Sequence, residues 1–138
     1  MRRSMQALIV VVLAAVMGFA FPPTASAAVV PFQIQPASYG NPNGSFDVPP
    51  IRCAVETGRQ RGVVTITGAD RGRWGCLAFG RVGWFNLTTG AAGRAKLSSG
   101  LNGIPPATSL RTGPGDVVIR IEAWGGVVTP GFATVRVP

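Results

Sequence analysis

The chain has 138 residues, 46% of them hydrophobic, with 13 basic and 5 acidic residues, no histidine and a formal net charge of +8. The lack of histidine excludes a serine–histidine triad and removes the commonest general base and metal ligand. Two cysteines that are expected to pair with each other leave no zinc site. We therefore expect a non-catalytic protein without a metal or other cofactor, and paired carboxylates are the catalytic arrangement that the composition leaves open.

The first residues carry the pattern of an export signal. Arg2 and Arg3 supply a positive start, residues 7–21 are an unbroken apolar run, and residues 25–27 form an A-x-A cleavage site. The apolar run is shorter than the roughly 20 residues that a membrane-spanning helix needs. We predict cleavage after Ala27, no transmembrane segment after cleavage, and a secreted protein located outside the cell or in the cell envelope.

Residues 28–50 are predicted to form an N-terminal edge strand and a loop, ahead of a β-sandwich domain over residues 51–138. Pro31 is tolerated only at a sheet edge, and the loop is rich in proline, glycine and asparagine. Further strands are predicted where apolar or β-branched residues recur with a period of two, at residues 51–56, 63–67, 74–79, 116–124 and 133–137. Residues 98–115 are the longest stretch without a strand pattern.

The two cysteines, Cys53 and Cys76, both follow the cleavage site. An even number of cysteines in an oxidising compartment favours a disulfide between them. The bond would enclose twenty-two residues, and closing a loop of this length contributes about 3–3.5 kcal/mol in the chain-entropy model. A redox pair needs closely spaced or thiolate-stabilised cysteines, and the sequence indicates neither, so we predict a structural bond.

Residues 81–97 predict a β-hairpin. Val82 and Trp84 alternate with polar or small residues in its first strand, and the second strand alternates in the same way. Gly90 and Gly93 can take the positive φ that a short hairpin loop needs. The same pattern of short alternating runs between glycine-rich turns recurs along the rest of the chain.

Seven or eight short strands without helical periodicity predict an all-β chain, folded as one small antiparallel β-sandwich with one disulfide. An immunoglobulin-like topology and a small barrel both stay open. The hairpin of residues 84–93 and the strand entry at residues 112–118 resemble small secreted actinobacterial β-sandwich proteins. The resemblance covers residues 51–138 and implies a secreted bacterial protein with this fold, but no particular activity.

Arginines concentrated in the middle of the chain suggest an anion-binding site. Its candidate residues are Arg59, Arg61, Arg71, Arg73, Trp74 and Arg81. The donor fork of arginine suits phosphate and carboxylate groups, and a tryptophan can stack on a sugar or a guanidinium. The simpler interpretation is that these charges only keep the loops soluble. A strand of five residues between the two arginine-bearing turns separates them by about 17 Å, so we expect two basic ends unless the chain crosses between sheets.

Two functions fit this sequence. The first is an envelope-associated module that binds an anionic polymer of the cell envelope through the arginines. The second is a secreted protein-binding domain, such as a hydrolase inhibitor, that uses residues 98–115 as its contact loop. Nucleic acid is not an expected partner, because an exported protein rarely meets it.

Overall fold

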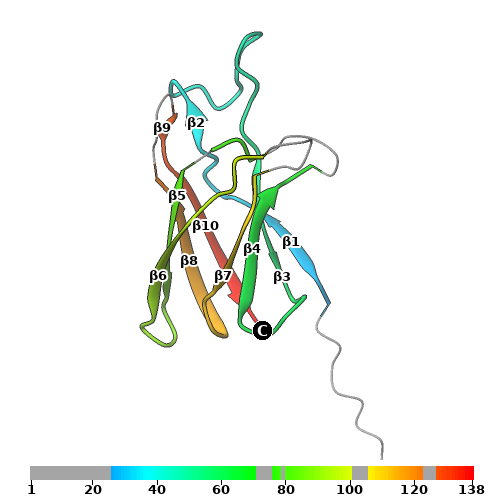
Figure 1. The fold of residues 1–138 in the computed structure, drawn as a ribbon, viewed down its shortest axis with the longest axis vertical. Helices are drawn as coiled ribbons and strands as arrows, with labels where there is room; N and C mark the ends of the chain where they lie inside the picture. Colours follow the sequence, from blue (N-terminus) through cyan, green and yellow to red (C-terminus); the bar gives the residue numbers. More distant parts are fainter. Residues whose placement is uncertain (1–25, 71–75, 79, 101–105, 123–126) are drawn as a thin grey trace, which may run out of the picture.

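The computed structural model describes residues 26–70, 76–78, 80–100, 106–122 and 127–138, and these residues form strands and turns without any helix. Eight strands build two antiparallel four-stranded sheets that pack face to face, as Figure 1 shows. The first sheet, in spatial order, contains β1 (Ala28–Pro31), β3 (Cys53–Thr57), β4 (Val63–Gly68) and β7 (Thr108–Arg111). The second contains β10 (Gly131–Val137), β8 (Gly115–Ile121), β5 (Arg81–Asn86) and β6 (Ala92–Lys96). A short ribbon pairs β2 (Ala37–Ser38) with β9 (Val127–Thr129).

This architecture confirms the predicted all-β sandwich. The two sheets share no ladder among the described residues, so they form an open sandwich and not a closed barrel. The first sheet also differs from the A-B-E-D sheet of an immunoglobulin domain, because its two central strands, β3 and β4, are consecutive in the chain. The chain then crosses to the second sheet for the β5–β6 hairpin and returns for β7.

The core lies between the sheets and follows from the alternation of apolar and polar residues. On β8, Ile119 and Ile121 are fully buried, whereas Arg120 between them is exposed. Ile66 on β4 is equally buried and belongs to the same core cluster from the opposite sheet. Each such side chain contributes about 1.5–3 kcal/mol when it leaves water. A register shift of one residue would turn these side chains outward, so the pattern specifies which face of each strand points inward.

The predicted disulfide is present between Cys53 and Cys76, whose Cα atoms lie 4.4 Å apart. Both residues are fully buried, and Cys53 begins β3 with its side chain in the core. The predicted strand at residues 74–79 is wrong for its described part, since residues 76–78 belong to no strand. β3 and β4 each have a hydrogen-bonded neighbour on both sides in the first sheet. The chain that follows β4 therefore cannot pair with either of them.

The prediction for residues 98–115 is also wrong in part, because β7 lies within this stretch. Leu110 is buried in the core, and β7 pairs with β4 as the edge strand of the first sheet. Its sequence, Thr-Ser-Leu-Arg, holds only one strongly apolar residue, too few to show a period of two. Residues 101–105 lie outside the described residues.

The predicted β5–β6 hairpin is confirmed, with different roles for its two glycines. Gly90 has a φ of 75° in the turn, as expected. Gly93 has no positive φ; it lies opposite Trp84, and a Cβ at Gly93 would come within 2.7 Å of the Trp84 indole. Gly93 therefore makes room for an aromatic side chain that packs against the core.

A buried asparagine joins this hairpin to the loop between β7 and β8. The Asn86 side chain is fully buried; its Nδ2 donates to the carbonyl of Thr112 at 2.9 Å and that of Pro114 at 3.0 Å. Its Oδ1 accepts from the backbone N–H groups of Thr88 and Thr89 at 2.9 and 3.0 Å. One side chain thus satisfies backbone groups from two loops, which keeps one end of the sandwich together.

The two ends of the sandwich differ in shape. The loop between β2 and β3 projects beyond the sheets at one end, and the C-terminus and the β3–β4 turn lie at the other (Figure 1). β1 forms an edge of the first sheet, where Pro31 interrupts no ladder between two neighbouring strands.

Candidate anion-binding face

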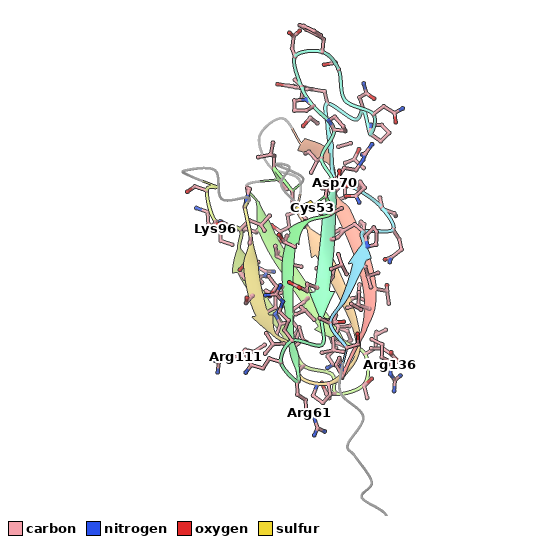
Figure 2. The ribbon with its side chains drawn as sticks, turned by 90° about the vertical axis from the view of Figure 1, so that its right-hand side faces the viewer. Cys53, Arg61, Asp70, Lys96, Arg111 and Arg136 are labelled. Atoms are coloured by element: carbon pink, nitrogen blue, oxygen red, sulfur yellow. A yellow bond between two sulfur atoms is a disulfide. The ribbon has the colours of Figure 1, made fainter. Side chains whose placement is uncertain are left out.

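Three of the residues predicted to bind an anion, Arg71, Arg73 and Trp74, lie outside the described residues. Asp70, the last described residue before them, lies toward the opposite end of the sandwich from Arg61, as Figure 2 shows. The separation of Arg61 and Arg71 would decide whether the two turns share one surface. The expectation of two separate basic ends, and its alternative of a single basic surface, therefore both stay predictions.

The other three predicted residues are placed on two different sheets. Arg59 and Arg61 share the turn between β3 and β4, where Arg59 Nε donates to Glu56 Oε1 at 2.6 Å. Arg81 begins β5 in the second sheet and is exposed. The structure therefore groups Arg59 with Arg61 but places Arg81 elsewhere.

Arg81 belongs to a group of four basic residues on the outer face of the second sheet. It lies directly opposite Lys96 on β6. Two residues further along β5, Gly83 lies between Arg94 on β6 and Arg120 on β8. All four side chains are exposed, and residues that oppose each other in an antiparallel ladder point to the same face. We call Arg81, Arg94, Lys96 and Arg120 the basic face.

The middle of the basic face is hollowed because Gly83 has no side chain. A Cβ at Gly83 would have no atom within 4 Å, so the space above the strand is open. The resulting shallow groove has a volume of about 510 Å³ and includes Arg94, Arg120, Phe85 and Phe132 among its lining residues. Backbone forms its floor at Gly83, and its side-chain lining is mainly cationic and aromatic, with one carboxylate, that of Glu122.

The charges of the basic face are not neutralised by ion pairs within the described residues. The ion pairs there join Arg59 to Glu56 and Arg136 to Asp116. Arg81 and Lys96 are like charges in direct opposition, which destabilises a sheet. The arrangement therefore leaves positive charge available to an external anion.

Arg120 has an aromatic neighbour in place of the acidic one expected from the sequence. Glu122 follows it by two residues on the same strand face and predicts a surface ion pair, yet no such pair forms in the described structure. The Arg120 guanidinium carbon instead lies 5.8 Å from the centre of the Phe132 ring. This cation–π contact, worth about 0.5–1 kcal/mol at an exposed site, holds the guanidinium at the edge of the groove without removing its charge.

The sequence contained part of this site. The alternation in residues 81–97 already places Arg81, Arg94 and Lys96 on one face of the hairpin. It does not show that β8, which begins 19 positions after the end of β6, pairs with β5 and adds Arg120. Nor does it show that Gly83, with no positive φ and no turn to explain it, lies between two arginines.

No protein-family model, curated protein or solved structure matches the chain. Among the described residues, no helix has the length and hydrophobicity to cross a membrane. The same part of the chain has no cluster of three or more histidine, cysteine, aspartate or glutamate residues that could hold a metal ion.

Proposed function

We propose that the protein is a secreted, non-catalytic binding module whose basic face holds an anionic polymer of the cell envelope. The observation that carries this proposal is the position of Gly83, an open floor between Arg94 and Arg120 beside the directly opposed pair Arg81 and Lys96. The site differs from the arginine turns expected from the sequence and shares only Arg81 with them.

The spacing of the charges suits a repeating anion. Neighbouring strands lie about 4.8 Å apart, so Arg94 and Arg120, on either side of β5, are about 10 Å apart at their Cα atoms. Residues two apart on one strand are separated by about 6.8 Å, which sets the step from Arg94 to Lys96. A polymer with a carboxylate or phosphate on each unit can contact several of these charges at once.

The shape of the groove supports an extended ligand. It lies on the outer face of an open sheet, and its glycine floor allows a polymer to approach the backbone closely. Phe85, 44% exposed, lines the groove and offers a face on which a sugar ring can stack, while Phe132 carries the Arg120 guanidinium over its ring. Donor forks for the anion and aromatic faces for the sugar are the two contacts that an acidic polysaccharide needs.

The alternative function, a protein-binding domain such as a hydrolase inhibitor, has less support. It uses residues 98–115 as a contact loop, but residues 108–111 are built into the first sheet as β7. Ser98 and Ala107 are joined by two hydrogen bonds of 2.9 and 3.0 Å, which fasten the intervening segment at its base. Less of this stretch is free to enter the cleft of an enzyme.

The proposal is tested by binding of the exported protein to a polyuronate and to a poly(glycerol phosphate), with neutral dextran as the uncharged probe. We expect both anionic polymers to bind and dextran not to. Arg120→Ala should weaken binding about tenfold, because a charge-assisted hydrogen bond is worth about 1.5–3 kcal/mol. Binding should weaken steeply as the salt concentration rises.

The matched control is Arg111→Ala, which removes the same charge from an exposed position on the first sheet. It should change affinity less than twofold. Equal losses for Arg111→Ala and Arg120→Ala would mean that net charge alone attracts the polymer, and the basic face would then not be a site. Equal binding of dextran would also contradict the proposal.

A further inference from the structure

The loop between β2 and β3 carries a fully exposed aromatic side chain. Phe46 has a relative exposure of 105%, so it packs against no part of the described protein. Tyr39, where this loop begins, is 75% exposed and takes a left-handed φ of 51°, unusual for a residue other than glycine. Scattered exposed apolar residues are common, but these two share a loop that projects from one end of the sandwich (Figure 1).

This loop is held in shape by its own hydrogen bonds. Asn41 Nδ2 donates to the carbonyl of Gly44 at 2.7 Å, and the N–H of Ser45 donates to the carbonyl of Val48 at 2.7 Å. The guanidinium of Arg52 donates to another loop carbonyl at 2.9 Å. Gly44 has a φ of 69°, and a Cβ there would lie 2.6 Å from the Val48 oxygen. A prearranged loop loses little conformational entropy on binding, so it presents Phe46 as a ready-made anchor.

The opposite end of the sandwich contains an apolar hollow. It has a volume of about 730 Å³, and its walls include Thr57, Thr89, Pro114 and Val137. This size falls within the usual range for ligand clefts and is ample for one aromatic ring. The β3–β4 turn and the C-terminus lie at this end, away from the projecting loop (Figures 1 and 2). We call the Phe46 loop the knob and this hollow the socket.

The charges of knob and socket are complementary. Asp47 directly follows Phe46 in the knob. Arg136 lines the socket, and Arg61 lies at the same end of the molecule (Figure 2). Arg136 already pairs with Asp116, whereas Arg61 forms no ion pair within the described residues. If the Phe46 ring of one copy enters the socket of another, the Asp47 carboxylate comes to the same end of that copy as Arg61, which has no ion pair within the described residues.

Removal of the export signal would change the socket. Ser26 is one of its wall residues, and its backbone carbonyl lies against Gly58. Cleavage after Ala27, as the sequence predicts, takes this wall away and widens the opening. It also leaves the new amino group of Ala28 opposite Thr57, adding positive charge near neutral pH. The volume of about 730 Å³ includes the Ser26 wall, so the socket of the exported protein is more open. The added positive charge favours a ring that is followed by an acid.

We propose that the exported protein associates head to tail, with the Phe46 knob of one copy in the socket of the next. Because knob and socket lie at opposite ends of the same molecule, one contact leaves both a free knob and a free socket on the pair. Such an arrangement extends into a row and does not close as a two-fold dimer. The inference is independent of polymer binding, since the basic face lies on the side of the second sheet.

The contact is small, and its strength follows from its size. A buried aromatic ring removes about 150–250 Å² of surface, well below the 1,200–2,000 Å² of a stable protein interface. Burying this area gives about 4–6 kcal/mol, so we expect association only in the millimolar range, with longer rows at higher concentration.

The test is sedimentation velocity of the exported protein over a series of concentrations, with the N-terminus determined. The wild type should show a sedimentation coefficient that rises with concentration. Phe46→Ala, which removes the knob, and Thr89→Trp, which fills the socket, should each sediment as monomers. Ile34→Ala is the matched control, since Ile34 is 51% exposed and belongs to neither surface; it should behave as the wild type.

An equimolar mixture of Phe46→Ala and Thr89→Trp gives the decisive result. The first variant keeps its socket and the second keeps its knob, so the mixture should form dimers and no larger species. Dimers in the mixture also rule out misfolding as the cause of the monomeric behaviour of each variant alone.

Two outcomes would overturn the inference. One is a wild type that stays monomeric at every concentration, or one whose association is unchanged in both variants. The other is Phe46-dependent binding of a monomeric protein to phosphatidylglycerol vesicles, which would assign the knob to a membrane surface. Polymer binding by Arg120→Ala is measured separately, so failure of one proposal leaves the other standing.

Discussion

The outer faces of the two sheets contrast although their inner faces are alike. On the first sheet, Thr65 and Ser109 lie opposite each other and their hydroxyl oxygens are 3.1 Å apart, within hydrogen-bond distance. On the second sheet, the corresponding cross-strand neighbours are Arg81 and Lys96, which repel each other. On the first face these two hydroxyl groups pair with each other, whereas the second face has two directly opposed cations beside an open glycine floor.

This difference shows where the sandwich has freedom. Core packing constrains every second residue of each strand, and both sheets meet that demand with isoleucine and valine. The residues between them point outward and are free of this packing constraint, so their identity reflects other demands on the surface. On the second sheet, Gly83 lowers the strand propensity of β5, and two opposed cations repel each other. Folding alone requires neither feature.

The largest loss of stability is expected from removing the disulfide, which lies in the core between the two sheets. Replacing Cys53 and Cys76 together by alanine should lower the free energy of unfolding by about 3.5 kcal/mol, because the unfolded chain regains the entropy that the disulfide removes. Urea denaturation of the purified protein measures this. An unchanged midpoint would show that the core alone holds the sandwich.

Asn86→Ala should lower the free energy of unfolding by about 3 kcal/mol. It removes the hydrogen-bond partner of several backbone groups in the two loops that Asn86 joins. Asn43→Ala, at an exposed position, is the control and should change stability by less than 0.5 kcal/mol. Thermal melting of both variants checks the prediction. Similar melting temperatures would contradict the role given to Asn86.

The sequence predicted the inner side better than the outer site. Alternation on β8 and β10 identified the buried residues, because core packing imposes a strict period of two. It missed β7, where only Leu110 is strongly apolar, and it missed Asn86, whose partners come from a loop far along the chain. The basic face depends on which strands are neighbours, and no local pattern encodes that.

Gly83→Val sharpens the comparison because it should move stability and binding in opposite directions. The new side chain fits open space in a strand, so stability should rise by about 0.5–1 kcal/mol. It also fills the groove floor, so affinity for the polyuronate should fall. Melting temperature and polymer titration on the same sample measure both. A stable variant with full affinity would remove Gly83 from the site.

A smaller change in stability is expected from substituting one residue of a single cross-strand pair. Lys96→Glu replaces repulsion with Arg81 by attraction and should raise stability by about 0.5 kcal/mol at low salt. The gain should shrink as salt screens the pair. Thr65→Ala on the first sheet should lower stability by about the same amount, without salt dependence. Denaturant titrations at two salt concentrations separate these results.

The most direct test of the central claim is a nuclear magnetic resonance titration of the purified protein with a short oligouronate. The account predicts that amide signals of Gly83, Arg94 and Arg120 shift along a single saturating curve. Signals of Thr65 and Ser109 on the first sheet should stay in place. Shifts confined to the first sheet or to the ends of the sandwich, or small shifts spread evenly over both sheets, would contradict a binding face on the second sheet.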